Sequence, residues 1–363
     1  MSYEIGGGMR KLLFVFISCY NKSMKNSDWP LVGNGHISAF LSKSIKNKKI
    51  AGFYIFCGPE NLGKDIAAVY FAKVLLCQNR KEDTPCDKCI SCRKFKVNKG
   101  DSQTMHSDLY FLEKEDEKKN ISIEKVRDFI SKLSMSSFMN TYKIGIIYEA
   151  HSLSTEAANA LLKTLEEPKK NVAIIMITPK IESLPQTIAS RSQILKFNPV
   201  QADKIHDYLV EKLEITRSAA KNFAHLSMGR PMLALKFIED KEFYQDYLDK
   251  VKIFIDFFNK DINERFGLLG GLSNEKKSNQ ENVSQILKII KIWEGIIRDL
   301  LLLELEQNDL ISNEIVRADL VKIKEKYKTG QLLKISTGLR QAEKYLLANV
   351  NPKLVLEQIA VNM

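Results

Sequence analysis

One glycine-rich loop constrains this chain more than any other feature. The apolar run 53–57 leads into Gly58-Pro59-Glu60-Asn61-Leu62-Gly63-Lys64-Asp65, and a helical pattern follows. Strand, glycine loop, lysine and helix form the order of a phosphate-binding P-loop, whose backbone N–H groups surround phosphate oxygens. The last loop position normally carries a Ser or Thr that binds Mg²⁺, but Asp65 stands there. The sequence therefore predicts a nucleotide-site skeleton without part of its chemistry.

The pattern on both sides of the loop predicts a parallel α/β unit. Apolar runs typical of buried strands recur at 108–112, 143–149, 172–178 and 193–197. Helical patterns separate them at 66–77, 123–133, 154–165 and 183–191, and another precedes the loop at 37–45. Strands that alternate with helices favour a doubly wound parallel sheet. After Pro199 the pattern is helical, with a turn at 228–231 and a polar connection at 270–281.

A chain of 363 residues is long for a single core, so we predict several domains. We place an N-terminal extension at 1–26, a P-loop domain at 27–198 with an insertion at 77–100, a helical lid at 199–242 and a helical C-terminal domain at 243–363. The apolar run 12–20 resembles a short signal peptide but is too short to cross a bilayer. We interpret it as extra residues before a start near Met24. The helix expected at 282–305 carries too many charges for a membrane span.

Four cysteines have the spacing of metal ligands. Cys86, Cys89 and Cys92 form C-x2-C-x2-C, and Cys77 lies nine residues upstream. Thiols spaced in this way converge on one tetrahedral ion, so we predict a closed structural Zn²⁺ site. We expect Cys19 and Cys57 to be inert. Reduced cysteines predict an intracellular, cytoplasmic protein.

The second position that would bind Mg²⁺ beside the P-loop is also altered. A working P-loop ATPase ends a neighbouring buried strand with an aspartate that holds Mg²⁺, followed by a glutamate. Here Tyr148 takes the aspartate position, and Glu149 remains. We therefore expect neither Mg²⁺ binding nor intrinsic ATP hydrolysis. ATP binding stays open, because Gly58, Gly63 and Lys64 are present.

Several longer stretches carry a family resemblance. They are Trp29-Pro30-Leu31-Val32-Gly33, the four cysteines after the P-loop, 159–168 (Asn-Ala-Leu-Leu-Lys-Thr-Leu-Glu-Glu-Pro), 184–191 (Leu-Pro-Gln-Thr-Ile-Ala-Ser-Arg) and 349–357 (Asn-Val-Asn-Pro-Lys-Leu-Val-Leu-Glu). The chain resembles the delta-prime subunits of the bacterial DNA polymerase III clamp loader, which are AAA+ proteins. The matching stretches span 29–357. The resemblance implies an AAA+ domain with a zinc knuckle, a lid and a C-terminal collar domain for oligomerisation.

The resemblance also assigns roles to single residues. Relatives project the arginine of a Ser-Arg-Cys motif into a neighbouring subunit's ATP site, and Ser190-Arg191-Ser192 occupies that place. A rigid, permanently charged guanidinium suits the charge that develops on phosphate. Thr178 matches the residue that senses γ-phosphate. Met232 stands where active relatives place a lid arginine, which again indicates a passive site.

Together these assignments imply a non-hydrolysing clamp loader subunit within the DNA polymerase III holoenzyme. It would help load the sliding clamp onto primed DNA, in a hetero-pentamer with gamma/tau-type motor subunits and delta. Two alternatives stay open. An ATP-hydrolysing motor subunit is one, although Asp65 and Tyr148 count against it. A zinc-dependent DNA-binding accessory protein is the other, favoured by a net charge of +11 and by lysines near the knuckle, but without a set of stacking aromatic residues.

Overall fold

A computed structural model describes residues 29–95, 106–115, 118, 120–139, 141–167, 169–272 and 278–363. The predicted extension at 1–26, Cys19, the end of the predicted insertion at 96–100 and Pro168 lie outside the described residues. The described chain divides into two compact units. The first comprises residues up to 220 together with 229–233, and the second comprises 221–228 and 234–363. The predicted four-part division stays a prediction.

The first unit is built on a five-stranded parallel sheet in the order β2-β3-β4-β1-β5. Its strands are β1 (Phe53–Cys57), β2 (Leu109–Leu112), β3 (Lys143–Ile147), β4 (Val172–Thr178) and β5 (Gln193–Lys196). The connecting segments are α2 (Gly35–Lys46), α3 (Lys64–Leu76), α4 (Ile90–Lys94), α5 (Ile123–Ser134), η1 (Ala150–Ser152), α6 (Thr155–Glu166), η2 (Ile181–Ser183) and α7 (Gln186–Ala189). The parallel sheet expected from the alternating pattern is thereby confirmed.

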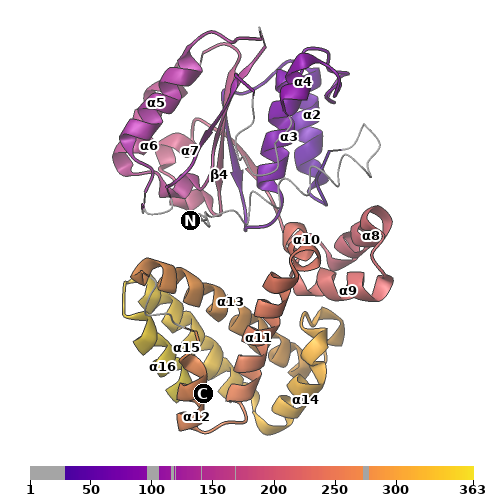
Figure 1. Cartoon of the computed structure of the whole chain (residues 1–363), viewed down its shortest axis with the longest axis vertical. Coiled ribbons are helices and arrows are strands. Elements are labelled where there is room, and N and C mark those ends of the chain that lie inside the picture. The colour runs from indigo at the N-terminus through magenta and orange to yellow at the C-terminus, as the bar shows by residue number, and fades with distance from the viewer. Residues whose placement is uncertain are drawn as a thin grey trace, which may run out of the picture. The chain divides into compact units, whose positions relative to one another are not determined.

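Side-chain alternation along β1 explains why helices cover both faces. Tyr54 and Phe56 pack in one apolar cluster with α2 and α3. Phe53 and Ile55 pack in the other, with α5 and α6. Successive residues of a strand point to opposite faces, so a run that is apolar throughout requires cover on both sides. Figure 1 shows this three-layer arrangement, with α2 and α3 on one side of β4 and α5 and α6 on the other.

One predicted helix is shorter than expected. The pattern at 183–191 predicted a single helix, but η2 ends at Ser183 and α7 covers only Gln186–Ala189. Leu184 between them is extended, with φ −107° and ψ 149°. Pro185 causes the break, because the residue before a proline is disfavoured in helical geometry.

The remaining helices are α8 (Ala202–Leu213), α9 (Arg217–Leu226), α10 (Pro231–Glu239), α11 (Lys241–Phe257), α12 (Ile262–Leu269), α13 (Asn279–Glu304), η3 (Asn308–Leu310), η4 (Glu314–Val316), α14 (Arg317–Lys326), α15 (Thr329–Leu347) and α16 (Pro352–Val361). The helical C-terminal region is confirmed, although α13 begins inside the predicted polar connection. None of the helices in the described ranges has the length and apolar character that a bilayer span requires.

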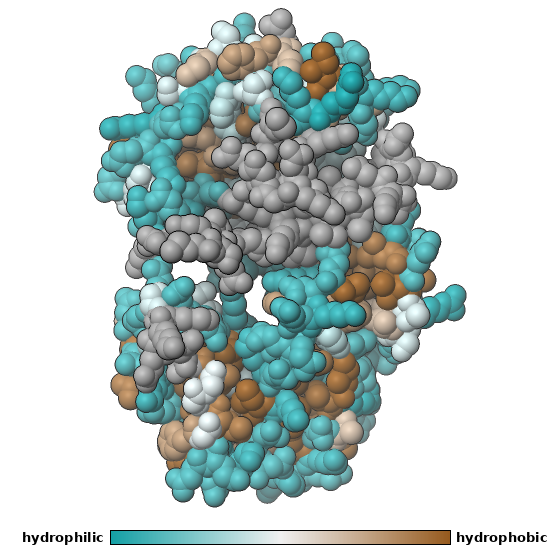
Figure 2. Space-filling model, in the orientation of Figure 1, coloured by the Kyte–Doolittle hydropathy of each residue, from teal (hydrophilic) through white to brown (hydrophobic). Residues whose placement is uncertain are grey.

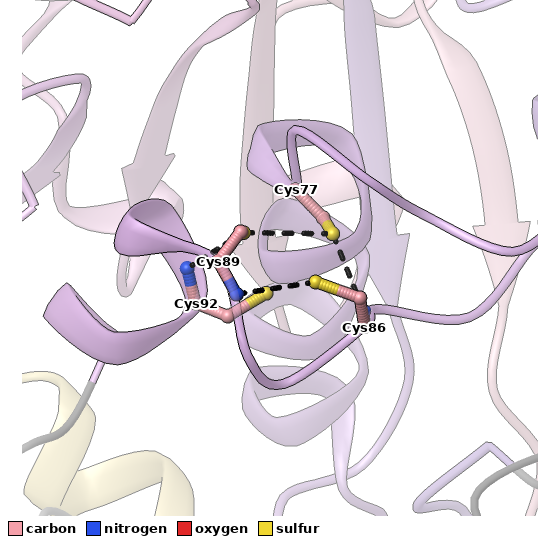
Figure 3. Close-up of side chains that lie close together, drawn as sticks. All are labelled: Cys77, Cys86, Cys89 and Cys92. Carbon is pink, nitrogen blue, oxygen red and sulfur yellow. Dashed lines mark hydrogen bonds between the residues drawn. The ribbon is translucent and has the colours of Figure 1, made fainter.

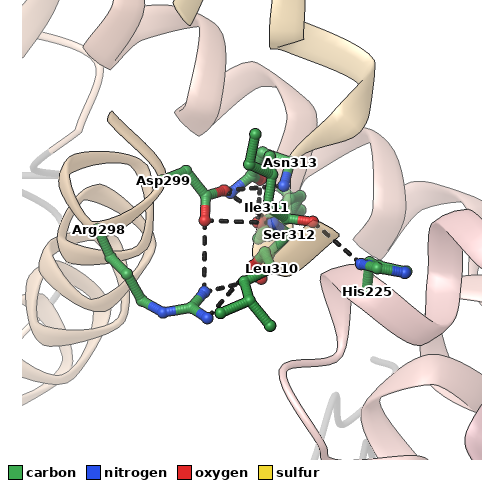
Figure 4. A network of polar contacts seen from close by, with 8 residues as sticks. His225, Arg298, Asp299, Leu310, Ile311, Ser312 and Asn313 are labelled. Carbon is green, nitrogen blue, oxygen red and sulfur yellow. Dashed lines mark hydrogen bonds and ion pairs between the residues drawn. The ribbon is translucent and has the colours of Figure 1, made fainter. Parts of the chain in front are cut away.

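The second unit contains a buried polar network around Asp299 of α13. The Asp299 carboxylate is fully buried and accepts hydrogen bonds from the backbone N–H groups of Ser312 and Asn313 and from Asn313 Nδ2. Arg298 forms an ion pair with it at 3.3 Å, and His225 of α9 bonds the neighbouring carbonyl of Ile311 (Figure 4). The network ties the 310–313 segment to α13 and α9.

Candidate functional site

The P-loop joins β1 to α3, at the carboxyl edge of the sheet. Gly58 has φ +143°, and a Cβ there would lie 2.3 Å from the carbonyl oxygen of Phe197. Gly63 has φ +85° and caps α3. Both positions therefore require glycine for geometric reasons alone.

Lys64 is buried and turned onto its own loop. Its Nζ donates hydrogen bonds to the carbonyl oxygens of Gly58 at 2.6 Å and Pro59 at 2.5 Å. Burial lowers the pKa of Lys64, and burial raises the pKa of the adjacent Asp65 carboxyl. At the position of the metal-binding hydroxyl, the loop thus carries a half-buried carboxyl group.

The neighbouring strands bring two more predicted residues to the same edge. Thr178 ends β4 beside the P-loop, and its carbonyl accepts a 3.3 Å bond from Gly58 N. Its hydroxyl is engaged locally, because it donates to Lys180 O and contacts Ser183 Oγ. Glu149 follows β3 in the left-handed conformation, with φ 47°.

Tyr148 and Met232 introduce no charge at this edge. The Tyr148 ring stacks on Phe111 of β2, with centroids 5.8 Å apart. Met232, at the start of α10, donates its backbone N–H to Asn61 O of the P-loop at 3.0 Å. The structure thus places Met232 beside the P-loop. Neither side chain offers a ligand that Mg²⁺ prefers.

Arg191 lies in the turn between α7 and β5, two residues before Gln193, the first residue of β5. Gln193 pairs with Tyr54, and Gly58 is four residues beyond Tyr54, so about 13 Å of strand at 3.3 Å per residue separates the start of β5 from the P-loop. Arg191 therefore cannot reach the P-loop of its own chain. Its guanidinium contacts Glu166 and the Thr187 carbonyl, and the side chain is 42% exposed.

The four predicted cysteines converge (Figure 3). Their sulfur atoms all lie within 4.8 Å of one another, and Cys77 Sγ and Cys89 Sγ are 3.9 Å apart. Tetrahedral zinc with bonds of about 2.3 Å places its sulfur ligands about 3.8 Å apart, so this donor set fits the ion. A hydrogen bond with Cys92 lowers the pKa of the Cys77 thiol to about 5, and the same bond raises the pKa of Cys92.

Backbone groups also favour thiolates in this cluster. The N–H groups of Cys86, Cys89 and Cys92 donate to the sulfur atoms of Cys77, Cys86 and Cys89, at 3.3, 3.3 and 3.4 Å. Hydrogen bonds to the charged form of a group stabilise that form. Because metal binding requires deprotonated sulfur, the four cysteines can hold a metal such as zinc.

Sequence reasoning missed a buried hydrogen-bond chain behind the knuckle. Ser91 donates to Leu76 O, and His106 Nε2 lies 2.8 Å from Ser91 Oγ. Because His106 Nδ1 accepts from Asp108 N, its Nε2 carries the proton and donates to Ser91. Burial lowers the pKa of His106, which favours this neutral form. The chain links the cysteine cluster to the start of β2.

Asp108 extends this chain to the segment after α5. Its carboxylate accepts bonds from Ser137 Oγ and from the backbone N–H groups of Phe138 and Met139. Asp108 is fully buried, and the one signal in the sequence that pointed to it is an aspartate immediately before the apolar run 109–112. Glu166, the partner of Arg191, carried no separate signal within its family motif.

A parallel sheet with a glycine-rich loop between β1 and α3 has the architecture of P-loop proteins. Residues 33–201 match the family model for "DNA polymerase III, delta subunit". The chain is similar to proteins named as tau, gamma and delta' subunits of DNA polymerase III.

The chain is similar to DNA polymerase III subunits of more than one type. The tau subunit of Bacillus subtilis is 32% identical over 58% of this chain, which spans only 36% of that subunit. The delta' subunit of the same organism is 26% identical over 90% of this chain and 94% of its own length. A gamma subunit-related protein from Thermotoga maritima superposes with a TM-score of 0.48 at 19% identity, over 88% of this chain and 97% of that one.

Proposed function

We propose that this chain is a non-hydrolysing clamp loader subunit of the delta' type, which supplies Arg191 to the ATP site of a neighbouring motor subunit. The observation that carries the proposal is the distance between the two candidate sites. Arg191 lies at the amino edge of the sheet and the P-loop at the carboxyl edge. An exposed arginine that cannot reach its own P-loop is suited to act on another subunit.

The chemistry of the P-loop supports the passive part of this proposal. Asp65 replaces the metal-binding hydroxyl, and Tyr148 packs on Phe111 where a metal-binding carboxylate is needed. Lys64 donates two hydrogen bonds to carbonyl oxygens of its own loop. The similarity to a delta' subunit over most of both chains agrees with this assignment.

The second unit suits assembly with other chains. Its surface carries large apolar side chains that are more than half exposed, including Leu305, Leu310, Leu347, Leu354 and Val361. Figure 2 shows hydrophobic patches among the hydrophilic side chains on the face in view. Exposed apolar patches mark interaction surfaces. We propose a collar-type oligomerisation surface here, within a cytoplasmic hetero-pentamer that also includes delta and acts on a sliding clamp and primed DNA.

The cysteine cluster completes the proposal as a structural Zn²⁺ site. Cys77, Cys86, Cys89 and Cys92 would hold the ion. All four positions are taken by protein ligands, so the ion would have no open position for catalysis. Its role would be to fold the insertion between α3 and β2.

The test is ATP turnover in the reconstituted complex with motor and delta subunits, clamp and primed DNA. Arginine fingers contribute about 10³–10⁵ to rate in other nucleotide hydrolases. The ATP sites that other subunits serve stay intact in Arg191→Ala. If the ATP sites of the complex are coupled, we expect this variant to lower turnover at least about tenfold. If the sites act independently, we expect turnover to fall by about the share of one site. Arg127→Ala, at an exposed arginine of α5, is the matched control. Unchanged turnover with Arg191→Ala would refute the proposed role.

The alternative hypothesis, an ATP-hydrolysing motor subunit (the motor reading), has one observation in its favour, the 32% identity to a tau subunit over 214 residues. A motor requires its own P-loop lysine. Lys64→Ala in the same complex therefore separates the two readings: the motor reading requires loss of turnover, whereas the proposed reading requires little change.

A further inference from the structure

Arg191 has a specific partner within its own chain. Its Nη2 lies 3.2 Å from Glu166 Oε1, and its Nη1 donates to the Thr187 carbonyl at 3.2 Å. The Glu166 side chain is 56% exposed, so the pair lies at the surface. These two contacts hold the guanidinium on two sides and leave the rest of it open to solvent.

The core fixes the backbone that carries this pair. Glu166 is the last residue of α6, and Leu165 before it is buried. Arg191 follows α7, whose Ile188 is fully buried in the same apolar cluster. The residues on both sides of the contact are thus anchored, and only the two side chains are free to move. An arginine side chain otherwise loses rotamer entropy when a ligand orders it.

We propose that Glu166 is a positioning residue for Arg191, which holds the guanidinium in one orientation at the amino edge before a neighbour's phosphates engage it. This inference rests on the proposed function. Exposed ion pairs are weak, so phosphate oxygens displace or share the contact readily. The pair therefore orders the arginine without trapping it, and the effect falls on the step at which phosphate charge develops.

The expected effect is modest and specific. Glu166→Ala should cause about half or less of the fold-loss in kcat of the assembled complex that Arg191→Ala causes, with KM for ATP unchanged, because a misplaced catalytic group costs rate and not ground-state binding. Glu166→Gln keeps the length and an acceptor oxygen, so it should recover part of the loss. Glu167→Ala is the matched control, because it removes the same charge at the same helix end. Glu167 forms no ion pair with any residue that the structure describes.

A double-mutant cycle decides whether Glu166 acts through Arg191. The experiment measures ATP turnover of the complex with wild-type chain, Glu166→Ala, Arg191→Ala and the double variant, after gel filtration confirms equal assembly. If Glu166 only positions Arg191, the double variant is no slower than Arg191→Ala. A slower double variant, or a Glu166→Ala complex as active as wild type while Arg191→Ala is impaired, overturns the inference alone. Full activity of Arg191→Ala overturns the proposed function and the inference with it.

Discussion

Replacing Asp299 with alanine tests the polar network of the second unit most directly. The fully buried carboxylate accepts from Asn313 N at 2.8 Å, Asn313 Nδ2 at 2.7 Å and Ser312 N at 3.1 Å. Asn313 and Ser312 are themselves almost fully buried, with 1% and 4% of their surface exposed. Alanine therefore leaves three donors without an acceptor in a space closed to solvent (Figure 4).

The size of the effect follows from those orphaned groups. Each buried donor left unsatisfied costs about 1–3 kcal/mol, and breaking a buried charge network costs about 3–5 kcal/mol. Water that enters the vacated space recovers part of the sum, so we expect a loss of about 3–5 kcal/mol in the free energy of unfolding. That is a large share of the roughly 5–15 kcal/mol that a folded protein has.

Tryptophan fluorescence provides an assay for this unit alone. The chain has two tryptophans, Trp29 in the first unit and Trp293 in the second. Trp293 is fully buried on the same helix as Asp299 and stacks on Phe254 at 4.8 Å. In a Trp29→Phe background, urea unfolding followed at Trp293 reports the second unit, and Asp299→Ala should lower the midpoint at unchanged slope.

Arg298→Ala is the control for that measurement. The Arg298 side chain is 48% exposed, so losing its ion pair with Asp299 and its hydrogen bonds to Ser312 Oγ and Leu310 O should cost about 1–2 kcal/mol, less than Asp299→Ala. A loss below 1 kcal/mol for Asp299→Ala, or equal losses for both variants, would show that the buried hydrogen bonds contribute little and would refute the reasoning.

Two further predictions concern the first unit. Purified chain should contain about one zinc ion per molecule by elemental analysis, and Cys89→Ser should abolish it, whereas Cys57→Ser in β1 should not; acidification should release the ion, because protons compete for the thiolates. Equal zinc content in both variants would contradict the four-cysteine site. Lys64→Ala should change the ATP turnover of the assembled complex by less than about twofold, because the loop already lacks its metal-binding hydroxyl; loss of most turnover would restore the motor reading.

Local patterns predicted the sheet well. The strands Phe53–Cys57 and Val172–Thr178 have the predicted bounds, because each is a continuous apolar run closed by a glycine or a polar residue. Ser154 caps α6 as expected, with its side chain accepting from Ala157 N at 3.1 Å. The cysteine cluster was predicted by spacing alone, since three of its members share one short turn.

Other features failed or escaped for identifiable reasons. The helix predicted at 183–191 is longer than the observed α7, because Pro185 interrupts the helical pattern. The start of α13 was missed although Ser278 and Glu281 form a capping box, a signal present in the sequence. The contacts of Asp108 with the segment after α5 join residues that are 29 to 31 positions apart in the chain. No local pattern encodes such a pairing.

The P-loop and Arg191 carry unequal weight as signs of function. Gly58 is required because a Cβ would strike Phe197 O, Gly63 is required by its positive φ, and Lys64 bonds the loop's own carbonyls. The fold alone thus explains each residue that makes the loop look like a nucleotide site. Arg191 is different, because 42% of its side chain is exposed and its ion pair with Glu166 contributes little to stability. Arg191 is therefore the residue whose place in the structure indicates function, whereas packing accounts for the P-loop skeleton.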